Sequence, residues 1–174
     1  EIGDLLVTAF TISHDGAEPV GYSVTDGTHS VVVATDMGVV SNAVRQRMLE
    51  ADCLVLESNH DERMLMDGVY PWRLKQRILS REGHLSNEAA ARELLMLADG
   101  PLSTLILAHL SEENNTPDMA MTAALEALTR AGRNDVEVLL SDQRVPLGPV
   151  SVGPEDSVEE TVATGVVASC TRSR

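Results

Sequence analysis

Short apolar, β-branched runs alternate with helix-patterned segments along most of this chain, and this alternation constrains the fold more than any other feature. Strand patterns cover residues 5–13, 20–26, 30–36, 53–58, 103–110 and 135–142, and helix patterns cover about 41–50, 71–80, 86–100 and 117–132. Ser41 and Ser86 suit helix N-caps, and Gly100 and Gly132 suit helix ends. The alternation predicts an α/β domain with a mixed β-sheet flanked by helices.

The size and apolar content allow one domain, or a large part of one. The chain has 174 residues and is 43% apolar but only 2% aromatic, so its core must be aliphatic. After Val145 the pattern dissolves into a stretch rich in glycine, proline and acidic residues. We expect residues 145–174 to form an acidic tail, with room for one edge strand at most.

Charge and cysteine usage narrow the class of protein. A formal net charge of −14 argues against a generally basic surface that coats nucleic acid, but it leaves a locally cationic or metal-lined cleft open. The two cysteines, Cys53 and Cys170, form no CxxC motif, so a reducing cytoplasm is the default location. No apolar stretch approaches the length of a membrane span. The chain starts at Glu1, without methionine and almost inside a strand pattern, which suggests an excised segment.

Titratable side chains gather where the predicted strands end. The run CLVL is followed directly by ESNHD at residues 57–61, so His60 follows one strand, as His14 and His109 follow two others. Asp36 ends VVVAT and His84 precedes a helix cap, whereas His29 lies in the turn DGTHS and has the pattern of an ordinary exposed residue. Any one of these residues is more often structural than functional. Several together at strand ends favour a metal or acid–base site along one edge of the sheet.

The residue types fit metal-assisted hydrolysis. Imidazole and carboxylate groups are ligands of Zn²⁺ and Mn²⁺, and a carboxylate can bridge two ions. A two-metal site can activate water and clamp a phosphate, and a further histidine can donate a proton to the leaving oxygen. A Ser–His–Asp hydrolase is the runner-up chemistry, but no GxSxG elbow is present, and no Walker or GxGxxG loop is present either.

Six motifs taken together resemble the second half of a metallo-β-lactamase-fold hydrolase. The motifs, in order, are SHDGAEPVGY (13–22), ATDMG (34–38), ESNHD (57–61), YPW (70–72), GHLSNEAAA (83–91) and AHLSEENN (108–115). They are similar to those of the bacterial WalJ (YycJ)-type branch, which is regarded as exonuclease-like and is more distantly related to tRNA 3′-processing nucleases. The resemblance covers roughly residues 5–140. It implies part of a four-layer αββα sandwich, with residues 1–144 as the C-terminal half of the domain.

The resemblance also implies roles for individual residues around two divalent metal ions, zinc or manganese. His14 would bind the first ion, His109 the second, and Asp36 would bridge both. His84 would serve as general acid or phosphate contact. His60 would contact the substrate or support the site from behind, and a hydrogen-bonded lid is an equally weighted alternative. Polar neighbours of the substrate would be Asn59, Ser86 and Asn87.

One departure from the family pattern leaves two functions open. The HxHxDH motif, which supplies most of the metal ligands in the family, is absent from this sequence. We expect it in a missing N-terminal half of the same domain, so that this segment alone is inactive and the whole protein is a nucleic acid phosphodiesterase. The alternative is a degenerate, non-catalytic binding module. Self-association of the chain into a homo-oligomer is a further expectation.

The phosphate backbone of a nucleic acid substrate is normally contacted by lysine and arginine side chains, which are few in this acidic chain. The densest group of them is Arg63, Arg73, Lys75, Arg77 and Arg81. Basic residues on a helix are more often only a solvated face.

Overall fold

A computed structural model describes residues 1–153 of the chain, which form one sheet and five helices. The strands are β1 (Leu6–Thr11), β2 (Val20–Thr25), β3 (Ser30–Ala34), β4 (Cys53–Glu57), β5 (Thr104–Ala108) and β6 (Glu137–Leu140). The helices are α1 (Asn42–Leu49), α2 (Glu62–Asp67), α3 (Trp72–Ile78), α4 (Asn87–Met96) and α5 (Pro117–Arg130).

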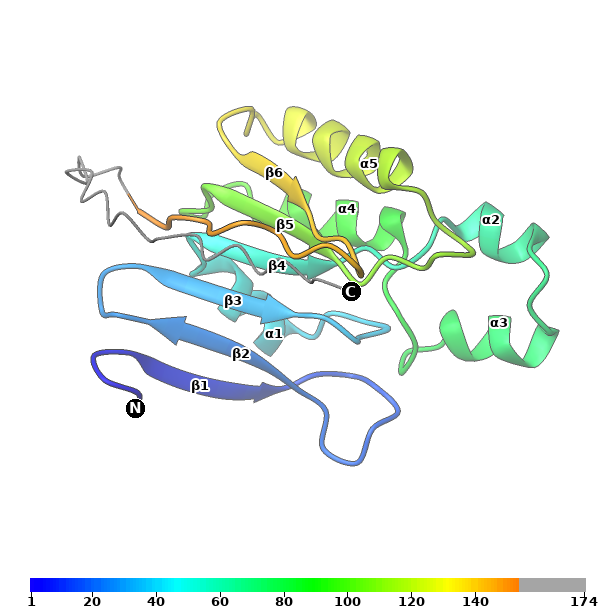
Figure 1. Cartoon of the computed structure of the whole chain (residues 1–174), viewed down its shortest axis with the longest axis horizontal. Helices are drawn as coiled ribbons and strands as arrows, with labels where there is room; N and C mark the ends of the chain where they lie inside the picture. Colours follow the sequence, from blue (N-terminus) through cyan, green and yellow to red (C-terminus); the bar gives the residue numbers. More distant parts are fainter. Residues whose placement is uncertain (154–174) are drawn as a thin grey trace, which may run out of the picture.

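The six strands form a single mixed sheet in chain order, β1-β2-β3-β4-β5-β6. β2 is antiparallel to both β1 and β3, whereas β3, β4, β5 and β6 are parallel to one another (Figure 1). β1 and β3 therefore run in the same direction, and the carboxyl ends of five strands lie at one edge of the sheet. The predicted mixed α/β sheet is confirmed.

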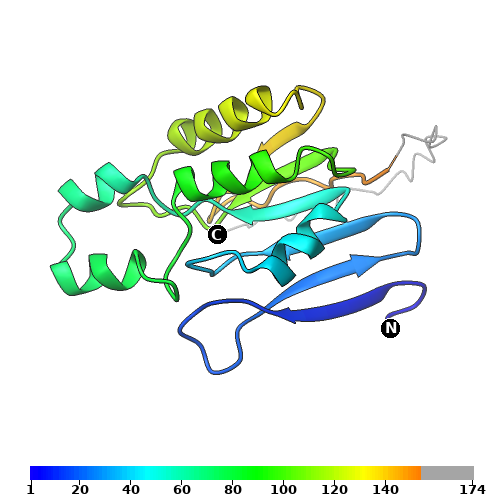
Figure 2. The same cartoon turned by 180° about the vertical axis from the view of Figure 1, so that it is seen from behind.

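Helices α1, α4 and α5 cover one face of the sheet and enclose the core (Figure 2). Val32, Leu54 and Leu105 are in register on adjacent strands and point to this face, where each is at most 1% exposed. Because side chains alternate between the two faces of a strand, their neighbours point to the opposite face. The chain thus contributes one sheet layer and one helix layer, the two layers expected for half of an αββα sandwich.

The other face of the sheet carries an apolar row that is only partly covered. Tyr22, Val33, Val55, Ile106 and Leu139 are in register there, and none of the five is fully buried. Residues 147–153 run across the β5–β6 end of this face (Figure 1).

Three details bear on the predicted elements. The short helix α2, capped by Asp61, was not predicted, and α4 ends at Met96, four residues before Gly100. Residues 145–153 contain no helix or strand, and the rest of the predicted tail with its edge strand lies outside the described residues. The predicted boundary at residue 144 stays a prediction.

None of the helices in residues 1–153 combines the length and apolar content needed to cross a membrane.

Candidate metal centre

The site is built at the carboxyl ends of four strands that run in the same direction. His14 follows β1, Asp36 follows β3, Glu57 is the last residue of β4, and His109 follows β5. His84 joins them from the loop between α3 and α4. Residues from five separate parts of the sequence therefore meet at one edge of the sheet, as was predicted for His14, Asp36 and His109 from the strand ends and for His84 from its place before a helix cap.

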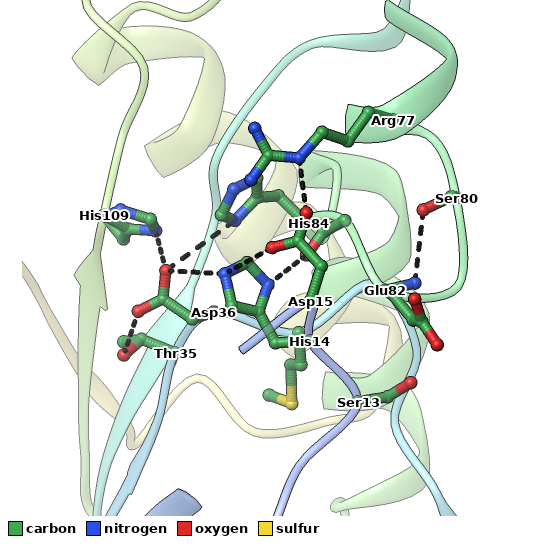
Figure 3. A network of polar contacts seen from close by, with 12 residues as sticks. Ser13, His14, Asp15, Thr35, Asp36, Arg77, Ser80, Glu82, His84 and His109 are labelled. Carbon is green, nitrogen blue, oxygen red and sulfur yellow. Dashed lines mark hydrogen bonds and ion pairs between the residues drawn. The ribbon is translucent and has the colours of Figure 1, made fainter. Parts of the chain in front are cut away.

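Asp36 lies at the centre of three imidazoles (Figure 3). Its Oδ1 is 3.5 Å from Nδ1 of His109, 3.9 Å from Nδ1 of His84 and 3.9 Å from Nε2 of His14. Asp36 and His109 have φ values of 59° and 58°, the only non-glycine residues in the described chain with positive φ. Such left-handed backbone costs free energy at non-glycine residues and concentrates at functional sites.

The ring of His14 is oriented by a backbone carbonyl. Its Nδ1 donates a hydrogen bond to the carbonyl oxygen of Gly83 at 3.1 Å, so Nε2 carries the lone pair. That Nε2 faces carboxylates, 3.4 Å from Oδ1 of Asp15 and 3.9 Å from Asp36. An imidazole that donates one N–H to a backbone carbonyl and leaves its other nitrogen free is arranged as a metal-binding histidine is in proteins.

Glu57 is a fully buried carboxylate behind these rings, with 0% exposure. Its Oε1 accepts hydrogen bonds from Nδ1 of His84 at 2.7 Å and Nδ1 of His109 at 2.8 Å. Its Oε2 accepts from the backbone N–H groups of Met37 at 2.9 Å and Leu85 at 3.2 Å. Burial by itself raises the pKa of Glu57, but these hydrogen bonds outweigh it and lower the pKa below its ordinary value. The hydrogen bond to Glu57 in turn raises the pKa of His109.

These contacts determine which ring nitrogens are available to a ligand. An ionised carboxylate only accepts, so the Nδ1 atoms of His84 and His109 carry protons and their Nε2 atoms carry the lone pairs in the neutral rings. Two ligand atoms on one tetrahedral zinc are about 3.3 Å apart, since each Zn–N or Zn–O bond is about 2.0–2.1 Å. The 2.7 and 2.8 Å contacts of Glu57 are shorter and are hydrogen bonds. Glu57 therefore orients the imidazoles, although its oxygen also lies within 4.8 Å of the ligand atoms of Asp36, His84 and His109.

The donor set fits a divalent ion such as zinc or manganese. It offers imidazole nitrogens and a carboxylate, which suit both metals. His14, Asp36 and His109 are only three side chains, so they satisfy one ion better than two. A dinuclear centre would need further ligands from outside the described residues.

A cavity of about 380 Å³ opens beside the three histidines. One wall is formed by Leu74, Arg77 and Ile78 of α3 and by Tyr70, which precedes the N-cap of that helix. The opposite wall is the loop 110–113 after β5. The rim carries Glu82, Glu112 and Glu113, and Arg77 is paired with Asp15. A substrate held at the histidines can therefore extend along α3.

The three residues predicted as substrate neighbours lie in different surroundings. Asn59 lines the cavity, and its Nδ2 donates to the backbone oxygen of His109 at 2.8 Å, which supports the strained backbone there. Ser86 is buried as the N-cap of α4, where it accepts from Ala89 and donates to Glu62.

Asn87 is 3% exposed and is bonded to Ser58 and Asn115. Neither Ser86 nor Asn87 lines the cavity, and their contact with substrate stays a prediction.

The structure does not bring His60 into the cluster around Asp36. Its ring is 1% exposed, and neither ring nitrogen has a hydrogen-bond partner among the described residues. Burial lowers the pKa of His60 below its ordinary value, which favours the neutral ring. His29 pairs with Asp26 in the turn between β2 and β3, away from the site.

Glu57 was not predicted as a member of the site. Its signal was a glutamate that ends a buried apolar strand, because a carboxylate placed there must find hydrogen-bond donors or lose its charge. The motif ESNHD drew attention to His60 instead.

Comparison with known proteins identifies the family. Residues 1–110 match the model of the Beta-lactamase superfamily domain. The chain is 38% identical over 130 residues to exodeoxyribonuclease YycJ of Bacillus anthracis, covering 75% of this chain and 49% of that protein. It is 39% identical over 129 residues to exodeoxyribonuclease WalJ of Streptococcus pneumoniae, covering 74% of this chain and 48% of that protein. The chain thus spans about half the length of the curated relatives it matches.

Solved structures agree on the fold. The metallo-β-lactamase fold protein YhfI from Bacillus subtilis superimposes with a TM-score of 0.55 at 20% identity, over 82% of this chain and 48% of that one. Zinc-bound PqqB from Methylobacterium extorquens gives a TM-score of 0.51 at 19% identity, over 80% and 46% of the two chains. Together with the sequence matches, they show that this chain belongs to the β-lactamase superfamily, with the metallo-β-lactamase fold and a sequence of the WalJ type.

Proposed function

We propose that this chain supplies about half of the catalytic site of a metal-dependent phosphodiesterase that degrades DNA from an end. The observation that carries the proposal is the convergence of His14, His84 and His109 on Asp36 at one edge of the sheet. The relatives named exodeoxyribonuclease support DNA as the substrate and an exonuclease as the kind of activity.

The residues divide into ligands and a proton donor. We propose that His14, Asp36 and His109 bind the metal, with Asp36 shared between two ions. Bound divalent ions supply Lewis-acid stabilisation of the phosphoryl oxygens and lower the pKa of water. The remaining ligands would come from an upstream half that carries HxHxDH, so residues 1–174 alone are proposed to be inactive.

His84 is proposed as the general acid. Its Nδ1 donates to buried Glu57, so a protonated ring presents the Nε2–H to the cavity. Glu57 stabilises the charged imidazole until Nε2 passes its proton to the leaving oxygen, and His84 then remains with Nδ1–H bonded to Glu57.

The test compares two variants of the full-length protein. Asp36→Ala removes a central carboxylate, so metal content and hydrolysis of DNA should fall together. His84→Ala should lower turnover by about a hundred- to ten-thousand-fold while metal content stays near the wild-type value. His29→Ala is the matched control, because this histidine lies in the turn at the other end of β3.

Metal analysis and phosphodiesterase rates for all three variants decide the outcome. Complete loss of metal from His84→Ala would make His84 a ligand and reverse its role. Full activity in both Asp36→Ala and His84→Ala would refute the proposed nuclease activity of this site. A full-length protein without HxHxDH, metal or activity would instead be a binding module.

A further inference from the structure

One segment of this acidic chain is positively charged. Residues 62–81 carry five of the 13 lysines and arginines but only two of the 27 aspartates and glutamates. Their net charge is therefore +3 in a chain whose net charge is −14. Contact with a polyanion is most favourable where the local charge is positive. Lys75 is buried and Arg63 pairs with Asp67, so the exposed cations that can meet a nucleic acid strand here are Arg73, Arg77 and Arg81.

The same segment projects from the sheet at the end where the site lies. It forms α2, α3 and their connections, which extend beyond the carboxyl ends of the strands in both views (Figures 1 and 2). α3 is also a wall of the cavity that contains His14, His84 and His109. A strand lying on α3 therefore has a direct path to the proposed metal ligands.

The exposed side of α3 presents two arginines and an indole. Successive residues of a helix are about 100° apart, so Arg73 lies about 40° from Arg77 and Trp72 lies about 100° beyond Arg73. Arg77 borders the cavity with its side chain 61% exposed. Arg73 is exposed and forms no ion pair within residues 1–153. Around the helix from the cavity, Arg77 therefore comes first, Arg73 next and Trp72 last, about 140° from Arg77.

Trp72 decides what kind of nucleic acid fits this surface. It is the single tryptophan of the chain, in a sequence with only 2% aromatic residues, yet 57% of it is exposed. An exposed aromatic ring beside arginines is the combination that binds single strands, because each unpaired base can stack on the ring while the cations contact the backbone. Bases in a duplex are already stacked on one another and cannot do so.

We propose that the α3 surface, defined as Trp72, Arg73 and Arg77, binds single-stranded DNA and guides the end of the strand into the cavity beside His14, His84 and His109. The inference rests on the proposed function for the identity of the polymer. Trp72 stacks on a base, Arg73 contacts a phosphate, and Arg77 marks the entrance to the site.

Binding without hydrolysis tests the surface directly. Full-length protein in EDTA is titrated against a fluorescent oligodeoxythymidine, and anisotropy is followed at several salt concentrations. Trp72→Ala should weaken binding about 5- to 100-fold at every salt concentration, and Trp72→Phe should restore most of it. Arg73→Ala should reduce the slope of log K against log salt by about 0.7, the contribution of one phosphate on a single strand.

A matched variant and a second measurement separate the alternatives. Arg130→Ala is the control, because this arginine is 72% exposed on α5, outside the cavity, and should leave affinity and slope unchanged. Wild-type DNA affinity in both Trp72→Ala and Arg73→Ala refutes the proposal that this surface binds DNA. An equal loss of affinity in Trp72→Ala and Trp72→Phe refutes it as well, because the aromatic ring is then not what binds. Sedimentation that shows Trp72→Ala converting a dimer to a monomer at unchanged DNA affinity would make this surface a contact between copies of the chain, and the proposal wrong.

Hydrolysis distinguishes this proposal from the one on which it rests. Wild-type protein loaded with zinc or manganese is assayed on the oligonucleotide and on bis(p-nitrophenyl) phosphate, which is too small to span the surface. Cleavage of neither substrate refutes the proposed function. If the wild-type protein cleaves both substrates, the proposed function stands. If Trp72→Ala and Arg73→Ala then have the wild-type KM for the oligonucleotide, the proposed role of the α3 surface is refuted.

Discussion

Replacing Glu57 by glutamine keeps the shape of the side chain and removes the charge that organises the site. Glu57 accepts four hydrogen bonds, two from imidazoles at Oε1 and two from backbone N–H groups at Oε2. Glutamine has one acceptor oxygen and one NH₂ donor group. One of the two pairs of donors must therefore face another donor.

The structure gives two possible responses, with different magnitudes. If the amide oxygen keeps the backbone N–H groups, His84 and His109 can accept from the NH₂ group only by moving their protons to Nε2. The Nε2 lone pair of His109 is then lost, and metal affinity should fall about 10- to 100-fold. If the rings do not change tautomer, two buried donors stay unsatisfied, and the free energy of unfolding should fall by about 2–6 kcal/mol.

We expect the first response, because a proton shift within each ring leaves every buried group with a partner. The assay is metal affinity of full-length Glu57→Gln, together with ¹⁵N shifts of the histidine rings and the unfolding midpoint. Glu93→Gln is the control, since Glu93 is also poorly exposed but pairs with Arg45 between α1 and α4. A Glu57→Gln protein with wild-type metal affinity and a wild-type midpoint would refute the assigned tautomers.

Two further predictions concern the elements that support the site. Gly38→Ala would place a Cβ 2.1 Å from the backbone oxygen of Ser80 and 2.6 Å from the backbone nitrogen of Gly83, so the loop that orients His14 must move. Metal affinity and hydrolysis should fall in this variant. They should stay unchanged in the control Gly148→Ala, where the added Cβ meets nothing within 4 Å. Equal metal affinity in the two variants would show that the close contact at Gly38 does not support His14. Lys75→Met leaves the backbone oxygens of Met66 and Gly68 without the buried ammonium that bonds them at 2.6 and 2.7 Å. The free energy of unfolding should fall by about 2–4 kcal/mol and proteolysis should increase within residues 62–78, measured beside the exposed control Gln76→Met; unchanged stability would show that water replaces the lysine.

Local patterns in the sequence were enough to predict the sheet and the place of the site. The alternation of short apolar runs with capped helices depends on side-chain periodicity and capping, which act over a few residues. The polar residues after these runs could be assigned to one edge because strands of one direction end together. His14, Asp36 and His109 were found in this way and His84 by its place before a helix cap, and their individual roles stay proposals.

Only the tertiary structure decided which polar residues of the motif ESNHD take part in the site. Glu57 and His60 are three residues apart in ESNHD and both are buried. Glu57 accepts from four donors, whereas the His60 ring has no hydrogen-bond partner within residues 1–153. Those donors come from residues 37, 84, 85 and 109, so no local pattern could reveal them. Burial and hydrogen-bond partners depend on which distant segments pack together, and that is why Glu57 was found only in the folded chain.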